Sequence, residues 1–148
     1  MLKEGDFAPN FLLKCTEGSY HSLYSFLGKR VVIYFYPKDD TPGCTKEACG
    51  FREDYKEIRG KDTIIIGISA DNIDSHINFK EKHKLPFMLL SDPDYIVARK
   101  YGALKNFFGF NLKKIKRCTF VVDEKGKIMK IFNDLNVDSH SKEILDLL

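Results

Sequence analysis

Apolar runs alternate with polar, helix-compatible segments through the middle of this chain. Residues 30–36 and 63–69 are rich in β-branched and aromatic side chains, the composition of buried strands. Residues 42–59 contain several Glu and Lys and no proline after Pro42, which favours a helix, and Gly60 is suited to cap its end. Residues 73–84 have apolar positions at helical spacing. The order strand, helix, strand, helix is typical of an α/β fold.

Shorter elements complete this prediction. They are a hairpin (11–15 with 20–22), a helical turn (23–27), a strand (87–90), a helix (94–101), a second hairpin (117–122 with 127–132) and a closing helix (139–148). Residues 103–116 show no clear period, so we interpret them as a long loop. Its aromatic cluster at 107–110 is expected to pack in the core, unless part of it lines a substrate entrance or a dimer contact. We expect a central mixed sheet with helices on both faces, in one α/β domain over residues 1–148.

Composition and charge narrow the functional classes. Hydrophobic residues make up 43% of the 148 residues and charged residues 30%, as in soluble globular proteins. The net charge of +3 comes from scattered lysines, so we expect no nucleic-acid partner. The charged amino terminus does not look like an export signal, and no apolar run is long enough for a membrane span. We therefore expect a cytoplasmic protein without a membrane partner. Four cysteines are too few for a disulfide scaffold.

One cysteine occupies a chemically special position. Pro37 ends the strand at 30–36 because it has no N–H for the sheet. Thr41 and Pro42 form a helix start with Thr41 as the N-cap, so Cys44 is the third helical residue. The N–H groups of a first helical turn lack intrahelical acceptors, and the helix dipole adds partial positive charge. Both stabilise a thiolate, and cysteine pKa values at such sites fall from about 8.5 to between about 3.5 and 7.5.

Two carboxylates close to this cysteine act in the opposite direction. Asp39 and Asp40 would disfavour the thiolate if they lay beside it. If they point into solvent, screening weakens their effect and the helix end dominates. The sequence therefore predicts a reactive thiolate at Cys44 at neutral pH.

The motif around this cysteine resembles that of a known family. Pro37, Thr41 and Cys44 follow the spacing Pro-x3-Thr-x2-Cys. Cys49 comes five residues after Cys44, and Arg117 lies far downstream, two residues before the pair Thr119-Phe120. Within Tyr-Pro-Lys-Asp-Asp-Thr-Pro-Gly-Cys, this pattern resembles the peroxiredoxins, and most of all their bacterioferritin-comigratory-protein or Q-type subfamily. The likeness extends over nearly the whole chain and implies a thioredoxin-like fold.

The resemblance implies a thiol-dependent peroxidase. Cys44 would be the peroxidatic nucleophile that reduces hydrogen peroxide or an organic hydroperoxide and becomes a sulfenic acid. Arg117 would lie beside the thiolate, and the backbone N–H groups of Gly43 and Cys44 would bind the peroxide oxygens. The Thr41 hydroxyl would accept from the peroxide or donate to the sulfur. Pro37 would keep the loop rigid and help to shield the sulfur from water.

Cys49 would be the resolving cysteine, which condenses with the sulfenic acid to a disulfide that thioredoxin or a similar dithiol protein reduces. Five residues apart on an intact helix, two Cα atoms are about 8–9 Å apart, whereas a disulfide needs them within about 7 Å. We therefore expect residues 44–52 to unwind locally when the disulfide closes. The alternative role of Cys49 is that of a small buried helix residue. The resemblance also implies a monomer or a weak dimer.

The remaining candidate groups have simpler interpretations. Cys15 and Cys118 are expected to be core thiols, with Cys118 facing away from Cys44. The four histidines lack metal-ligand spacing with a cysteine pair, and no glycine-rich nucleotide motif occurs, so we expect neither a metal nor a nucleotide cofactor. Two competing functions stay open. One is a thiol–disulfide oxidoreductase acting on proteins, although the sequence lacks Cys-x-x-Cys, and the other is a redox-responsive binding module or holdase.

Overall fold

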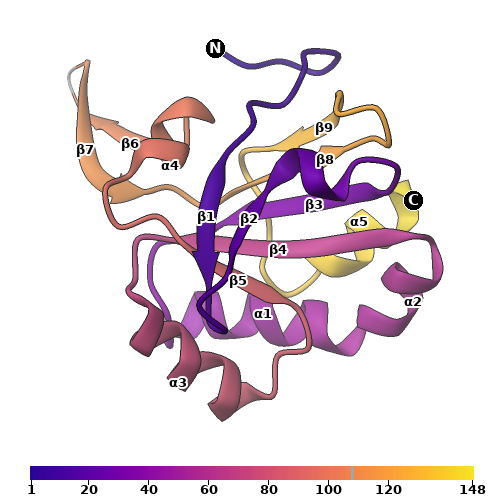
Figure 1. Ribbon diagram of the computed structural model, residues 1–148, viewed down its shortest axis with the longest axis horizontal. Coiled ribbons are helices and arrows are strands. Elements are labelled where there is room, and N and C mark those ends of the chain that lie inside the picture. The colour runs from indigo at the N-terminus through magenta and orange to yellow at the C-terminus, as the bar shows by residue number, and fades with distance from the viewer. Residues whose placement is uncertain (108) are drawn as a thin grey trace.

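A seven-stranded mixed sheet forms the centre of the protein in a computed structural model, which describes residues 1–107 and 109–148 (Figure 1). In spatial order the strands are β2 (Tyr20–Ser22), β1 (Leu12–Cys15), β5 (Met88–Ser91), β4 (Thr63–Ser69), β3 (Arg30–Phe35), β8 (Cys118–Val122) and β9 (Ile128–Phe132). β4 pairs in parallel with β3 and β5, and the other pairs are antiparallel. The predicted mixed sheet and both predicted hairpins are confirmed.

Helices cover both faces of this sheet, as predicted. One hydrophobic cluster, here called the α1 cluster, receives residues from α1 (Pro42–Glu53), α2 (Tyr55–Gly60), α3 (Ile73–His83) and α5 (His140–Leu147). The opposite cluster, called the α4 cluster, receives residues from α4 (Ile96–Lys100) and from the 3-10 turn Leu23–Phe26. Successive side chains of β3 alternate between the two clusters, as the pleat of a strand requires. Such a strand is buried on both sides, which explains its continuous apolar run.

The helix predicted over 42–59 is in fact two helices, because the helical conformation is interrupted at Asp54. Asp54 has φ −98° and ψ 7°. Its carboxylate accepts from Ser141 Oγ at 2.7 Å and from Lys142 Nζ at 2.6 Å, both on α5. These partners lie 87 and 88 residues away along the chain, so the local pattern does not reveal the break. Gly60 is the last residue of α2 and not its cap.

Residues 103–116 do not form the predicted loop. They contain a separate antiparallel pair, β6 (Leu104–Phe107) and β7 (Phe110–Ile115). The register shifts within this pair, which interrupts the two-residue alternation that identifies a strand in a sequence. The residues that pair at its base are buried in the α4 cluster. The aromatic cluster predicted at 107–110 falls partly outside the described residues, so its role stays a prediction.

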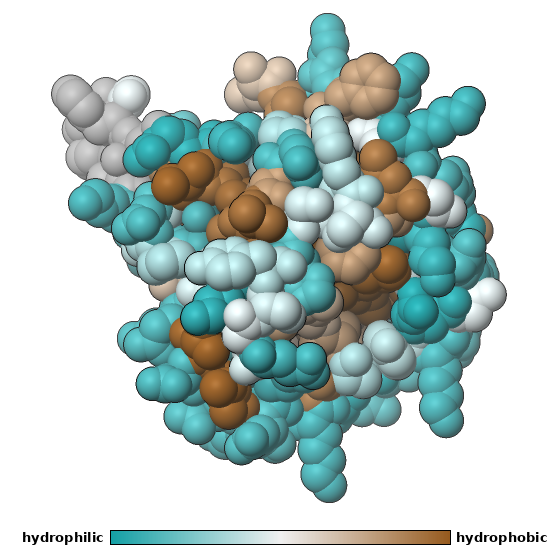
Figure 2. Space-filling view, in the orientation of Figure 1, coloured by the Kyte–Doolittle hydropathy of each residue, from teal (hydrophilic) through white to brown (hydrophobic). Residues whose placement is uncertain are grey.

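The surface carries separate hydrophobic patches on an otherwise hydrophilic face (Figure 2). A groove of about 520 Å³ is lined by residues that include Leu12, Tyr20 and Ile96, which are 65%, 62% and 53% exposed. Cys44 and Arg117 are not among its lining residues, so this groove is distinct from the site described next. Within the described ranges, no helix combines the length and the apolar character that crossing a membrane requires.

Candidate active site

The sulfur of Cys44 lies at the amino-terminal end of α1, where the sequence analysis expects it. Thr41 is the N-cap residue, with extended backbone, and Pro42 is the first helical residue. Cys44 is only 1% exposed, and Arg117 Nη2 donates to its Sγ at 3.3 Å. Arg117 immediately precedes β8, which pairs with β3, the strand that leads toward α1. The sheet therefore brings together two residues that are 73 positions apart.

A carboxylate that sequence reasoning missed shares the same guanidinium. Glu47, on α1, is 2% exposed, and its Oε1 accepts from Arg117 Nη1 at 2.6 Å. Its Oε2 is buried without a hydrogen-bond partner among the described residues. Burial raises the pKa of Glu47 to about 7, and the charge of Arg117 opposes that rise only in part. The one available signal was weak: three residues after Cys44, Glu47 lies on the same helical face.

The other expected site residues lie in the loop and first turn around the sulfur. Thr41 Oγ1 donates to the carbonyl of Lys38 at 2.9 Å, so in this conformation its hydrogen does not reach the sulfur. The hydroxyl oxygen remains able to accept from a peroxide O–H. A Cβ at Gly43 would lie 3.1 Å from Arg117 Nη2, so glycine allows the guanidinium its close approach. Pro37 lies two residues after the end of β3 and is partly buried.

The two aspartates before Cys44 differ, and the condition that they point into solvent is met by Asp40 but not by Asp39. Asp39 is 7% exposed, and its Oδ1 accepts from Tyr36 OH at 2.6 Å. Two further partners of its carboxylate lie on α3, 36 and 37 residues later in the chain, where no local pattern reveals them. Asp40 is exposed. Hydrogen bonds from Lys82 and His83 lower the pKa of Asp40.

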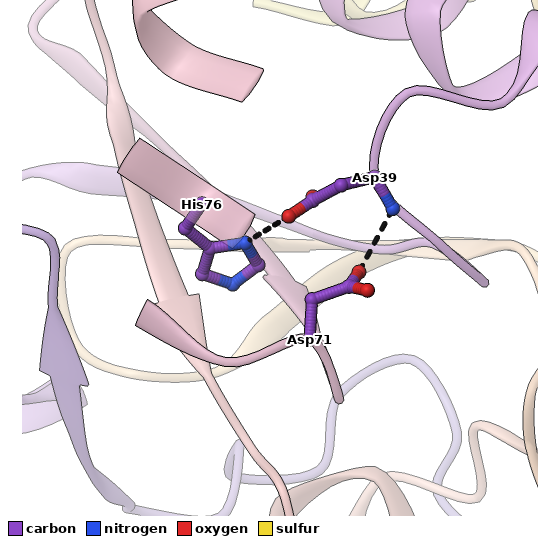
Figure 3. Close-up of side chains that lie close together, drawn as sticks. All are labelled: Asp39, Asp71 and His76. Atoms are coloured by element: carbon purple, nitrogen blue, oxygen red, sulfur yellow. Dashed lines mark hydrogen bonds and ion pairs between the residues drawn. The ribbon is translucent and has the colours of Figure 1, made fainter. Parts of the chain in front are cut away.

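Asp39, Asp71 and His76 form a compact group whose side-chain ligand atoms lie within 4.8 Å of one another (Figure 3). Protein groups already engage these atoms. His76 Nε2 lies 3.0 Å from Leu90 O, and His76 Nδ1 lies 2.6 Å from Asp39 Oδ2. Asp71 Oδ2 accepts from Ser69 Oγ at 2.6 Å and from the Asp39 N–H at 2.8 Å. The group is therefore a hydrogen-bond network, and its geometry is explained without a cation.

All four cysteines are free thiols. Cys49 lies on α1 and is partly exposed. Cys15 and Cys118 are buried in the α4 cluster, on the opposite side of the sheet from Cys44. Burial raises the pKa of Cys118 to about 12, which makes it a poor nucleophile at neutral pH. The prediction that these two residues are core thiols, with Cys118 facing away from Cys44, is confirmed.

A buried histidine lies in the same half of the molecule. His140, the first residue of α5, is 1% exposed, and its Nε2 lies 2.8 Å from Thr119 Oγ1 on β8. Burial and the charge of Arg117 lower the pKa of His140 to about 4. His140 is therefore neutral at pH 7 and adds no second positive charge beside the guanidinium.

Comparison with known proteins agrees with this geometry. Residues 5–131 match the AhpC/TSA family. The chain is 42% identical over 146 residues to peroxiredoxin Bcp of Bacillus subtilis, which covers 97% of this chain and 93% of that protein. It is 40% identical over 149 residues to peroxiredoxin Bcp of Escherichia coli, which covers 99% and 96%. Peroxidoxin BcpB of Mycobacterium tuberculosis has a crystal structure that matches with a TM-score of 0.89 at 34% identity, covering 99% of this chain and 96% of that one. The predicted resemblance and the thioredoxin-like fold are thus confirmed. The chain belongs to the AhpC/TSA family, and within it to the peroxiredoxins of the Bcp and Q type.

Proposed function

We propose that Cys44 is the peroxidatic nucleophile of a thiol peroxidase that reduces hydrogen peroxide and organic hydroperoxides. The observation that carries the proposal is the 3.3 Å hydrogen bond from Arg117 Nη2 to the Cys44 sulfur in the first turn of α1. A guanidinium and a helix amino terminus both favour the anionic form of a thiol. Membership of the peroxiredoxins supports the same chemistry.

The first step moves two electrons from sulfur to oxygen. The Cys44 thiolate attacks one peroxide oxygen, so that an S–O bond forms while the O–O bond breaks. The departing hydroxide or alkoxide takes a proton from solvent and leaves as water or alcohol, and Cys44 becomes a sulfenic acid. Arg117 and the N–H groups of Gly43 and Cys44 would stabilise the charge on the departing oxygen. The Thr41 oxygen would accept from the peroxide O–H, and Pro37 would limit motion of the loop.

The second step forms a disulfide between Cys44 and Cys49. The Cys49 thiolate attacks the sulfenic sulfur, and the oxygen leaves as water after taking a proton. Both cysteines lie on the intact helix α1, where a spacing of five residues keeps the Cα atoms about 8–9 Å apart. A disulfide needs about 7 Å or less, so the amino-terminal part of α1 must unwind. Ser141 and Lys142 bind the Asp54 carboxylate between α1 and α2. These contacts support the proposal that the unwinding does not extend beyond Asp54.

A dithiol protein of the thioredoxin kind would return the two electrons by thiol–disulfide exchange. The family membership supports both the peroxide substrates and this type of reductant. We also propose that residues 1–148 form one domain, since both hydrophobic clusters pack on the same sheet. A monomer or weak dimer in the cytoplasm, where the thiols are kept reduced, completes the proposal.

Stopped-flow mixing of the reduced protein with hydrogen peroxide tests this function. Wild type should consume one equivalent rapidly and form a Cys44–Cys49 disulfide, and Cys44→Ser should not react. Cys49→Ser should keep the first oxidation and lose the disulfide, while Cys118→Ser serves as the control that changes neither. Insulin reduction by a protein that does not react with peroxide would instead identify a thiol–disulfide oxidoreductase and refute the proposal.

A further inference from the structure

The loop that leads into α1 contains a residue in an unfavourable backbone conformation. Asp40 has φ +59°, in the left-handed region, which costs a residue with a Cβ about 1–2 kcal/mol. Thr41 Oγ1 donates to the carbonyl of Lys38 within the same loop, so the orientation of Thr41 follows that of the loop. Aspartate tolerates this region better than most residues with a Cβ, and contacts from outside the loop also hold it.

Helix α3 supplies such contacts through one buried carboxylate. Asp39 Oδ2 accepts from Ser75 Oγ at 2.8 Å and lies 2.6 Å from His76 Nδ1. Asp39 Oδ1 accepts from Tyr36 OH at 2.6 Å. The Asp39 N–H donates to Asp71 Oδ2 at 2.8 Å (Figure 3). The side chain and the backbone of Asp39 are therefore both bound to groups outside residues 37–41.

Within this network, the His76 ring is also held by a hydrogen bond at Nε2, the ring nitrogen that faces away from Asp39. The ring is completely buried, and its Nε2 donates to the carbonyl of Leu90 on β5 at 3.0 Å. Because a carbonyl oxygen only accepts, Nε2 carries a hydrogen and Nδ1 is the atom turned toward Asp39. The separation of 2.6 Å between Nδ1 and Asp39 Oδ2 is that of a hydrogen bond. Two hydrogen bonds thus connect the central sheet to the loop before Cys44.

A second contact between α3 and the loop is more exposed. Asp40 accepts from Lys82 Nζ, but the two side chains are 46% and 59% exposed. His83 Nε2 lies 3.0 Å from the other oxygen of Asp40. Exposed ion pairs contribute about 0–1 kcal/mol, whereas removing one partner of a buried hydrogen bond costs about 1–3 kcal/mol. His83 therefore provides a comparison on the same helix for the buried His76.

We propose that His76 is a positioning residue for peroxide reduction, which holds the Asp39 carboxylate and thereby the loop that presents Thr41 and the amino terminus of α1. This inference rests on the proposed function, because it assigns the loop a role in the peroxide step. Without the Nδ1 hydrogen bond the loop shifts relative to Arg117, whose guanidinium is held independently by Glu47. A displacement of about 1 Å at a reacting centre costs up to about a hundredfold in rate.

Two substitutions at position 76 separate this role from simple packing. His76→Asn keeps an amide N–H near the place of Nδ1, so it keeps the donor to Asp39 and loses the one to Leu90. His76→Gln keeps a donor near the place of Nε2, so it keeps the bond to Leu90 and loses the one to Asp39. Both variants lose the same ring. His83→Gln is the matched control on the exposed contact.

Stopped-flow reaction of each reduced protein with hydrogen peroxide gives the first readout. His76→Gln should slow the reaction of Cys44 by about tenfold to a hundredfold, while His76→Asn and His83→Gln stay close to wild type. Equal losses in the two position-76 variants would mean that only the packing of the ring matters, and would overturn the proposal. A wild-type rate in His76→Gln would overturn it as well.

Amide hydrogen exchange of residues 38–43 gives a second readout that needs no peroxidase activity. Exchange should increase in reduced His76→Gln and not in His76→Asn. Absence of peroxide reaction in wild type would refute the proposed function, while the exchange comparison would still test the hold on the loop. If the position-76 variants do not fold, Asp39→Ala removes the carboxylate that His76 holds and leaves the ring in place. Unchanged exchange in that variant would then overturn the proposal.

Discussion

Replacing Glu47 by Gln tests whether a buried carboxylate titrates beside the reactive sulfur. The substitution keeps an oxygen that accepts from Arg117 and removes the charge that the fold holds at 2% exposure. The pKa of Glu47 is raised by burial from 4.5 to about 7. At about 1.4 kcal/mol for each pH unit, ionising this carboxyl inside the fold costs about 3 kcal/mol.

The sign of the pH effect follows from which state, folded or unfolded, binds more protons at Glu47. Between pH 4.5 and about 7, Glu47 is ionised in the unfolded chain but still protonated in the folded protein. The folded state therefore binds more protons at this group, and the contribution of Glu47 to the free energy of unfolding falls as the pH rises through this window. Glu47→Gln has no such group. Relative to wild type, the variant should gain about 3 kcal/mol of stability between pH 4.5 and pH 8.

Urea unfolding at several pH values between 4.5 and 8 measures this difference. A Cys44→Ser background keeps ionisation and oxidation of the reactive thiol out of the comparison. Glu53→Gln is the control on the same helix, because the Glu53 side chain is 69% exposed. Its stability should follow that of the parent at every pH. A constant difference between Glu47→Gln and its parent across this range would refute the reasoning about the buried carboxyl.

Three further predictions concern the surroundings of the sulfur. Gly43→Ala places a Cβ 3.1 Å from Arg117 Nη2, so it should slow the peroxide reaction, whereas Gly60→Ala, with open space at its Cβ, should leave the rate unchanged; equal rates would contradict this. Disulfide formation should raise amide exchange of residues 44–52 but not of α2, and equal protection of 44–52 in both redox states would count against unwinding. Burial lowers the pKa of His140 to about 4, so the unfolded chain binds a proton there first, and the contribution of His140 to stability should fall as the pH drops from 6.5 to 4, opposite in sign to that of Glu47. Urea unfolding should therefore show the stability of His140→Gln rising relative to wild type as the pH drops over that range, and a constant difference would exclude this explanation.

Local sequence patterns are sufficient to predict the elements whose formation depends on neighbouring residues. The buried run at 30–36, the proline that ends it and the Thr-Pro helix start together predicted the position of Cys44, because each acts within a few residues. The hairpin with Asp123 and Gly126 at its turn was predicted for the same reason. Gly126 has φ +91°, which glycine adopts readily.

The features that were missed depend on partners distant in the chain. Asp39 looks like a solvated loop charge until α3 provides its donors. Glu47 looks like an ordinary helix-forming residue until Arg117 meets it, 70 positions later. The break between α1 and α2 coincides with contacts of Asp54 to α5. Contacts with residues distant in the sequence determine the surroundings of these three carboxylates, and a local sequence pattern carries no information about such contacts.

The reaction of a single-cysteine protein with hydrogen peroxide tests the central claim most directly. In a chain with Cys15, Cys49 and Cys118 replaced by Ser, the rate constant at pH 7 is compared with and without Arg117→Lys, and Arg52→Lys serves as the control. The account predicts a fast reaction of the parent that falls by about tenfold or more in Arg117→Lys, since a hydrogen bond to a charged group is worth about 1.5–3 kcal/mol. A parent that reacts no faster than free cysteine, or equal rates for the parent and Arg117→Lys, would contradict it.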